Sequence, residues 1–339
     1  MNRRGLILLL LSALAATALW CELTPATDDT VVVYVSHDEV FSEPILKDFE
    51  RDTGIRVKAV YDTEETKSAG VMNRLIAEKS HPQADVYWAN EPIRAEVLKQ
   101  QGVSVPYRSP SAEGIPRQFT DPDGHWTGFS ARARVLIVKQ GLVDVPVSIQ
   151  DYADPRFNGK TVLANPLFGT TTAHIAALFT LWGDERAKAF LDVMRRNGVH
   201  VSSSNGDSAD QVATGMFQFA LVDSDDVHSR QQQKQPVEVV YPDQEDGGMG
   251  CFIVPNAVLL IKGGPHPGAG KRLIDYLLSR ETEKKLAYSD AAQIPLHPGV
   301  ETPADVRRLE TLKVMHVDYA AVAAKMLAIQ SFLKDWVGS

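Results

Sequence analysis

TGFSARARVLIVK, residues 127–139, is the stretch that decides the fold. It predicts one long strand, and a strand of this length can cross from one lobe of a protein to another. A second long extended stretch, residues 252–262, is interrupted by Pro255 and predicts the return crossing. Two crossings predict two lobes with a cleft between them, and such clefts are favoured sites for small ligands.

The chain on the N-terminal side of residue 127 alternates between β-rich and helical patterns. Strands are expected at residues 31–35, 55–60 and 84–88, and apolar residues recur at helical spacing after each of them. The first of these helices is expected to end at Gly54. This alternation predicts a parallel sheet that is covered by helices on both faces.

A second α/β region follows the crossing strand. The expected strands are residues 161–164, 217–222 and 237–241, and the expected helices are residues 170–182, 185–197, 271–279, 305–312 and 318–336. The predicted fold class is therefore α/β, with two lobes that each hold a mostly parallel sheet flanked by helices. Lobe 1 is expected to comprise residues 31–130 and 252–298, and lobe 2 residues 131–251 and 299–339.

Residues 1–21 have the features of an export signal. A short positive segment precedes an apolar run of about 14 residues, which is shorter than a comfortable membrane span. Cleavage is expected after Ala18, or at a lipobox that ends at Cys21 and would lipidate it, although bulky Trp20 departs from that motif. An uncleaved anchor helix is the alternative. Residues 22–30 are expected to be a tether, and the mature protein is expected in the periplasm or on the outer face of the inner membrane.

Composition and motifs exclude several classes of protein. The formal net charge is −8 and no basic run lies outside the extreme N-terminus, which argues against nucleic acid as a partner. The sequence contains no G-x-S-x-G, P-loop or H-E-x-x-H pattern, so the usual signatures of an enzyme are absent. Two cysteines are too few for a zinc cage or a disulfide framework, and Cys251 is expected to be a small core residue. A monomer without a cofactor is expected.

Polar residues follow the strands of the first lobe. Ligands of parallel sheets bind at the carboxyl ends of strands, and this rule points to residues 37–39, 63–67 and the pair Asn90-Glu91. His37 in the first of these loops is a candidate metal ligand. An ordinary solvated loop is the alternative.

Residues 165–174, NPLFGTTTAH, are the most informative local run of the second lobe. A strand ends there, a glycine allows a tight turn, and Thr170 and Thr171 open a helix whose free N–H groups and dipole favour an anion. Plain capping of the helix by Thr170 is the alternative. In the polar loop 202–207, Asn205 offers an amide to a ligand, while a helix cap at Asp207 is the simpler interpretation.

Two arginines alternate with small residues in the crossing strand. Ser130, Arg132 and Arg134 occupy alternate positions, so they are expected to share one face of the strand. Arginines that face a cleft can clamp an oxyanion through paired N–H donors. The alternatives are a solvated edge and a salt bridge between the lobes.

Three carboxylates, Asp223, Asp225 and Asp226, directly follow the expected strand 217–222. Carboxylates at the end of a strand can bind a hard cation or an ammonium group. The alternative is a solvated acidic turn.

Several short stretches spread over nearly all of the mature chain carry a family resemblance. They are VYV (33–35) with His37 nearby, DTGIRV (52–57), PQADVYW (82–88), WTGFSARARV (126–135), ANP (164–166), PNA (255–257) and QIPL (293–296). Together they resemble the type II periplasmic binding proteins of the ferric-iron uptake group, the substrate-binding components of ABC importers. The resemblance implies capture of a ligand in the cleft and its delivery to a permease in the inner membrane.

The resemblance also implies a set of site residues. Ferric-binding members of the family use a histidine in the first loop and an acidic residue after the third strand, and His37 and Glu91 are near matches, each about one position out of register. Thr170 and Thr171 match a helix start that holds a synergistic anion, Arg132 matches an arginine, and Asn205 matches a polar ligand. The family's two adjacent tyrosines are missing, because the chain reads Asp-Ser-Asp-Asp at residues 223–226.

The missing tyrosines leave the ligand open. Ferric ion with an anion is the first expectation, with His37, Glu91 and Asp225 as metal ligands and Asn90 as a further contact. A phosphonate, a polyamine or an organic acid is the alternative, and a zwitterion would satisfy both the basic and the acidic groups. A ligand-sensing partner of a membrane receptor and an extracytoplasmic enzyme on the same fold are the other functions considered.

Overall fold

A computed structural model describes residues 29–62 and 69–338. The predicted signal 1–21, its cleavage sites and most of the predicted tether therefore lie outside the described residues, as does the whole of the predicted loop 63–67. Among the helices of the described ranges, none combines the length and the apolar character that a membrane span requires.

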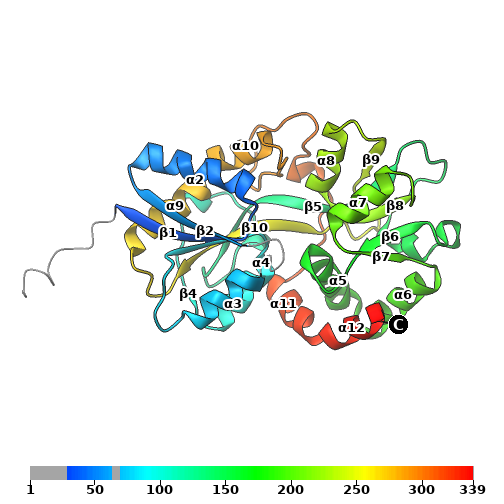
Figure 1. The fold of residues 1–339 in the computed structure, drawn as a ribbon, viewed down its shortest axis with the longest axis horizontal. Helices are drawn as coiled ribbons and strands as arrows, with labels where there is room; N and C mark the ends of the chain where they lie inside the picture. Colours follow the sequence, from blue (N-terminus) through cyan, green and yellow to red (C-terminus); the bar gives the residue numbers. More distant parts are fainter. Residues whose placement is uncertain (1–28, 63–68, 339) are drawn as a thin grey trace, which may run out of the picture.

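Two groups of elements lie at opposite ends of the molecule and are joined by two long strands (Figure 1). The elements of the first group are β1 (Thr30–Val35), α2 (Glu39–Thr53), β2 (Arg56–Tyr61), α3 (Ala69–Ala77), β3 (Val86–Ala89), α4 (Pro92–Gln100), β4 (Ser104–Val105), α9 (Pro267–Leu277) and α10 (Arg280–Tyr288). Strand β1 pairs in parallel with both β2 and β3, as the alternating sequence predicts. The helix α2 ends where Gly54 adopts a positive φ of 72°.

The second group holds a smaller parallel core. Its elements are β6 (Thr161–Ala164), α5 (Gly169–Trp182), α6 (Asp184–Arg196), β7 (His200–Ser202), α7 (Asn205–Ala213), β8 (Phe219–Asp223), α8 (Ser224–Gln232), β9 (Val237–Val240) and α12 (Gln330–Gly338). Strand β6 pairs in parallel with β7 and β8. The helix α11 (Tyr319–Ala328) contacts both α4 and α5 and so spans the two groups.

The crossing strands are β5 (Thr127–Lys139) and β10 (Ile253–Ile261), which pair antiparallel (Figure 1). The strand order β2-β1-β3-β10-β5-β8-β6-β7 places them at the centre of the sheet, with β4 on β10 and β9 on β5. Both strands are buried along almost their whole length. The assignment of residues to two lobes, as the sequence predicts it, stays a prediction.

The crossing strands are irregular at one point. Their register shifts between Pro255 and Asn256, and Ser130 on the opposite strand has a φ of 36°. Proline lacks the N–H that a regular ladder needs, so a bulge is the expected response. The N–H of Ser130 donates instead to Glu283 Oε1 of α10 at 2.8 Å.

Two predicted helices are wrong in their extent. Residues 305–312 form only a short 3-10 turn at Leu309–Thr311. The predicted helix 318–336 divides into α11 and α12 at Ile329, which is 4% exposed and turned into the core. Further 3-10 turns are Pro110–Ala112, Arg117–Phe119, Ile149–Ala153 and Pro155–Phe157.

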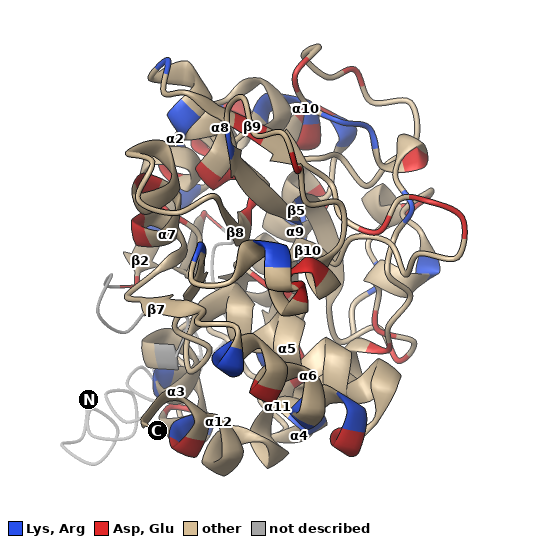
Figure 2. Cartoon of the chain, turned by 90° about the vertical axis from the view of Figure 1, so that its right-hand side faces the viewer, with Lys and Arg blue, Asp and Glu red and all other residues tan. Residues whose placement is uncertain are grey.

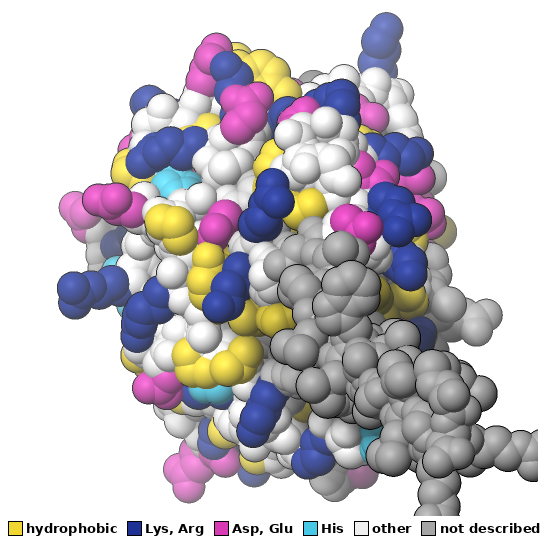
Figure 3. Space-filling model, turned by 90° about the vertical axis from the view of Figure 1, so that its left-hand side faces the viewer, with side chains coloured by type: hydrophobic (Ala, Val, Ile, Leu, Met, Phe, Trp, Pro, Cys, Tyr) yellow, Lys and Arg dark blue, Asp and Glu magenta, His cyan; other side chains and the backbone are white. Residues whose placement is uncertain are grey.

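Charges of both signs are interspersed on the two ends of the molecule (Figures 2 and 3). Among the residues drawn in colour, neither view shows Lys and Arg gathered into one basic patch. Cys251 is a free thiol and is fully buried, as predicted for a core residue.

Candidate functional site

The site lies where the crossing strand β5 passes the end of β8. Arg134 of β5 is directly opposite Asp223 in the antiparallel pairing of these strands. Asp223 is the last residue of β8, and α8 begins at Ser224, so Asp225 and Asp226 fall in its first turn. Unpaired N–H groups and the dipole favour acidic residues at a helix start. The local sequence therefore places three carboxylates at the carboxyl end of a strand.

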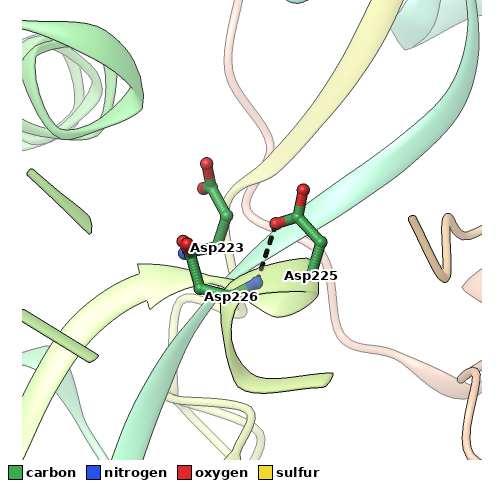
Figure 4. A group of neighbouring side chains, drawn as sticks. All are labelled: Asp223, Asp225 and Asp226. Carbon is green, nitrogen blue, oxygen red and sulfur yellow. Dashed lines mark hydrogen bonds between the residues drawn. The ribbon is translucent and has the colours of Figure 1, made fainter. Parts of the chain in front are cut away.

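These three carboxylates are crowded together (Figure 4). One oxygen from each of Asp223, Asp225 and Asp226 lies within 4.8 Å of the others. Burial, partly offset by Arg132, and repulsion by Asp223 raise the pKa of Asp225 to about 6. Burial and repulsion by Asp225 and Asp223 raise the pKa of Asp226 to about 8. The cluster therefore lacks part of the positive charge that would stabilise its ionised form.

Asp223 differs from its two neighbours because it has strong donors of its own. Arg134 Nη1 donates to Asp223 Oδ1 at 2.8 Å, and Thr170 Oγ1 donates to Asp223 Oδ2 at 2.9 Å. Asn205 Nδ2 lies 3.3 Å from the same Oδ2. Although burial opposes ionisation, Arg134 and Arg132 hold the pKa of Asp223 below its ordinary value. Asp223 is thus an ionised carboxylate that the protein itself neutralises.

Arg134 uses most of its donors inside the second group of elements. Its side chain is fully buried, and besides Asp223 it donates from Nη1 to Thr170 Oγ1 at 2.9 Å. Its Nη2 donates to Thr171 Oγ1 at 3.0 Å and to the carbonyl oxygen of Leu221 at 3.2 Å. Arg134 therefore forms an internal ion pair and holds the start of α5 against the end of β8.

Arg132 is the arginine that contacts the first group of elements. It is 7% exposed, and its Nη2 donates to the carbonyl oxygen of Asn90, just beyond β3. Among the described residues, its buried Nε has no hydrogen-bond partner. Burial opposes the charge, but Asp223, Asp225 and Asp38 together raise the pKa of Arg132. Arg132 thus lies between the aspartates at the start of α8 and the end of β3, with donor capacity to spare.

The structure places His37 beside aromatic rings. Its ring stacks on Trp88 at a centroid distance of 5.5 Å, and its Nε2 lies 3.3 Å from Gln293 Nε2. The neighbouring residue, Asp38, interacts electrostatically with both Arg132 and Asp225. The first loop therefore contributes a carboxylate to the site, and the offset of one position between His37 and the family pattern was the signal in the sequence.

Glu91 is committed to the start of α4. Its Oε2 accepts from the N–H of Ile93 at 2.6 Å, and its Oε1 accepts from Arg94 Nη1 at 2.7 Å. Within the described ranges, the three aspartates are the one group of three or more His, Cys, Asp or Glu side chains arranged to hold a metal ion, and His37 and Glu91 lie outside it. Their role as metal ligands stays a prediction.

The two helix caps that the sequence offered as simpler interpretations, Thr170 and Asp207, are wrong. The cap of α5 is Phe168, which makes no side-chain capping bond, and Thr170 lies inside the helix. The cap of α7 is Ser204 rather than Asp207, and Asn205 is the first residue of that helix. Hydrogen bonds instead bring Thr170, Thr171, Asn205 and Asp223 together, although these residues come from distant parts of the sequence.

Comparison with known proteins identifies the family. The family model for bacterial extracellular solute-binding proteins matches residues 45–314. The chain belongs to this family. It is therefore a periplasmic solute-binding protein of the kind that serves an ABC importer, as the resemblance implies, and the relatives leave its ligand open.

Two relatives differ in the ligands that their names state. Iron uptake protein A1 of Synechocystis sp. is 25% identical over 312 residues, which are 85% of this chain and 84% of that protein. A putative 2-aminoethylphosphonate-binding periplasmic protein of Salmonella typhimurium is 24% identical over 344 residues, which are 99% of this chain and 94% of that protein.

A solved structure confirms the fold. Apo ferric ion-binding protein A of Pasteurella haemolytica superimposes with a TM-score of 0.80 at 23% identity, covering 91% of this chain and 98% of that one. The predicted α/β fold of the type II periplasmic binding proteins is therefore confirmed.

Proposed function

We propose that this protein captures, at Arg132 and the neighbouring aspartates, a small ligand that combines a positive centre with an anionic group. The observation that carries the proposal is the juxtaposition of two carboxylates with raised pKa values, Asp225 and Asp226, and an arginine whose Nε is buried without a hydrogen-bond partner among the described residues. The carboxylates need positive charge, and the buried Nε of Arg132 needs a hydrogen-bond acceptor. A ligand that supplies both charges satisfies both sides.

Ferric ion with an oxyanion is the first candidate. Carboxylate oxygens are hard ligands that suit a hard, highly charged cation, and Asp225 and Asp226 supply them while Asp38 adds a carboxylate from the other lobe. The names of the Synechocystis and Pasteurella proteins support this choice. The metal is then the cargo of the protein and not a cofactor.

A zwitterionic amine is the second candidate. The name of the Salmonella relative supports an aminophosphonate, whose ammonium group would face Asp225 and Asp226 and whose phosphonate would face Arg132. Phosphonate oxygens match the planar fork of an arginine, which donates two parallel hydrogen bonds.

In this proposal the protein works as an exported monomer that delivers its ligand to an inner-membrane permease. It performs no reaction on the ligand, since its family consists of binding proteins. The lipid anchor at Cys21 and the outer face of the inner membrane as its location remain predictions of the sequence.

Thermal unfolding against a ligand panel tests the proposal. The panel is ferric citrate, ferric nitrilotriacetate with carbonate, 2-aminoethylphosphonate, spermidine and small organic acids. A ligand at 100 times its Kd adds about 2.7 kcal/mol to the free energy of unfolding, so we expect a clear rise in Tm for one ligand that carries both charges. The rise should be lost in Asp225→Ala and in Arg132→Gln, and kept in Asp246→Ala, which changes an exposed loop residue. A ligand whose effect on Tm is the same in Asp225→Ala as in the wild type would falsify the proposal.

A further inference from the structure

The polar groups at the start of α5 are already bonded to a carboxylate of the chain itself. The sequence predicts that Thr170, Thr171 and Asn205 receive the anionic group of a ligand. In the structure, Thr170 Oγ1 donates to Asp223 Oδ2 at 2.9 Å, and Asn205 Nδ2 donates to Thr170 Oγ1 at 3.0 Å and lies 3.3 Å from Asp223 Oδ2. Thr171 Oγ1 donates to Asn205 Oδ1 at 3.2 Å. The set is closed on itself around one carboxylate.

The remaining oxygen of this carboxylate is held by a buried arginine. Arg134 Nη1 donates to Asp223 Oδ1 at 2.8 Å, and the Arg134 side chain is fully buried. A charged donor on one oxygen and neutral donors on the other are what a small free oxyanion would need to bind tightly. Asp223 itself is 7% exposed, so its carboxylate leaves little room for a second anion at these donors.

The other arginine of β5 is not closed in this way. Arg132 gives one hydrogen bond, to the Asn90 carbonyl, whereas Arg134 gives four. The buried Nε of each arginine has no partner among the described residues. The two arginines therefore have different roles. Arg134 neutralises an acidic residue of the protein, and Arg132 has donor capacity for a ligand.

We propose that the Asp223 carboxylate is a built-in anion, which fills the niche formed by Arg134, Thr170 and Asn205 and directs the anionic group of the ligand to Arg132. The effect of Asp223 on where the ligand binds rests on the proposed function, whereas the test of the occupied niche needs no ligand of the proposed function. The consequence is that cation capture at Asp225 and Asp226 needs no free oxyanion in the niche.

Emptying the niche tests the inference without any cation. Asp223→Ala removes the carboxylate, and formate, which is a carboxylate of one carbon, is titrated against it with chloride at the same ionic strength as reference. We expect a saturable rise in Tm of about 2–4 °C with formate in the variant and none in the wild type. The double variant Asp223→Ala/Thr170→Val, which removes a donor with little change of shape, should lose most of this rise. Asp223→Asn, whose amide still fills the niche, should not respond to formate.

The outcomes that overturn the inference are equally defined. A formate response of the same size in wild type and Asp223→Ala, or one that Thr170→Val does not reduce, means that formate binds elsewhere. If Asp223→Ala fails to fold without formate and folds when formate is present, the inference is supported. If Asp223→Ala folds neither with nor without formate, the response of the wild type decides. A saturable rise in wild-type Tm with formate that Thr170→Val abolishes shows that the niche is open and the inference is wrong. Absence of any rise in wild-type Tm supports the inference.

The failure of the inference can be told from the failure of the proposed function. A protein that binds none of the panel ligands can still show the formate response, because the Tm of the cation-free variants is the readout. Conversely, a protein that binds ferric citrate through Asp225 while formate fails to stabilise Asp223→Ala keeps its function and loses the built-in anion.

Discussion

Two groups of carboxylates in this molecule differ in their hydrogen-bond donors: the buried Glu283, and the half-buried pair Asp225 and Asp226. Glu283 of α10 is fully buried, and its Oε1 accepts from the N–H groups of Ser130 and Leu296, each at 2.8 Å. Its Oε2 accepts from His297 N at 3.0 Å and is 2.7 Å from His297 Nδ1. In α8, by contrast, the side-chain oxygens of Asp225 and Asp226 accept one main-chain N–H each among the hydrogen bonds of the described residues.

The difference separates a structural carboxylate from one that is available to a ligand. Glu283 ties the bulge of β5 to the segment 294–297, so its donors are part of the fold. Burial and repulsion by neighbouring aspartates raise the pKa of Asp225 to about 6 and that of Asp226 to about 8, although Arg132 partly neutralises Asp225 and Arg230 partly neutralises Asp226. A buried polar group without enough partners is costly, and functional sites are where such costs are kept.

The largest effect is expected at the structural carboxylate. Glu283→Ala leaves four buried donors without their acceptor and should lower the free energy of unfolding by about 4 kcal/mol, measured by urea denaturation. Glu281→Ala, an exposed position in the same helix, should stay within about 0.5 kcal/mol of the wild type. A loss below about 1.5 kcal/mol for Glu283→Ala would remove the contrast between the two regions.

The second effect falls on binding rather than on folding. Asp225→Ala should weaken the ligand identified in the panel by about 100-fold, equivalent to about 2.7 kcal/mol, while the unliganded protein unfolds at or above the wild-type denaturant concentration. The unliganded variant should not be destabilised, because loss of the Asp225 carboxylate relieves its repulsion with Asp223 and Asp226. Titration calorimetry and urea denaturation of the same preparations check this, and a variant that is less stable yet binds normally would place Asp225 with Glu283 as a structural residue.

The third effect is a dependence on pH. The pKa values of Asp225 and Asp226 lie above the usual 3.8, so the folded protein holds these protons more tightly than the unfolded chain does. Stability should therefore fall as pH rises from about 4 towards 8, and the double variant Asp225→Asn/Asp226→Asn should remove about 1–2 kcal/mol of that fall between pH 5 and pH 8.

Urea denaturation at the two pH values measures this difference. Burial and the charge of Arg134 lower the pKa of His174, which gives an opposite slope below pH 6.5 that is common to both proteins and cancels in the comparison. Equal slopes for the wild type and the double variant would show that the aspartates are neutralised by other groups.

The smallest effect concerns Glu91, which the sequence predicts as a metal ligand and the structure places at the cap of α4. Glu91→Gln should lower the free energy of unfolding by about 1 kcal/mol, because the carboxylate caps the helix and pairs with Arg94. Ferric citrate affinity should change less than twofold if the cap is its whole role. A tenfold loss of affinity at unchanged stability would instead make Glu91 a cation ligand.

Much of the fold could be read from local patterns. The strands β5 and β6 have the predicted bounds, and Gly54 follows the helix that it was predicted to end. Alternation of strands and helices specifies a parallel sheet because each helix must bury its apolar face against it. The predicted helix 305–312 failed although Val306 and Leu312 are buried, because so short a segment gains few hydrogen bonds for the cost of starting a helix.

The candidate site could be predicted as a set of residues but not as a set of partners. Carboxyl ends of parallel strands meet at one edge of a sheet, and this rule is why polar residues after β1, β3, β6 and β8 were selected as candidates. Which of them neutralise one another depends on contacts between distant segments. Arg134 and Asp223 are separated by 89 positions in the sequence, and no local pattern distinguishes Arg134 from Arg132, which is two residues away.

The sequence by itself determined the family, the two crossing strands and the places where polar side chains gather, because these follow from periodicity and from short motifs along the chain. The tertiary structure alone decided which charged side chains pair with groups of the protein and which are available to a ligand. Asp223 is matched by Arg134 and Glu283 by donors as far as 153 positions away, whereas Asp225, Asp226 and Arg132 are matched only in part. Burial and the distance to the nearest opposite charge fix that outcome, and both are properties of the folded molecule.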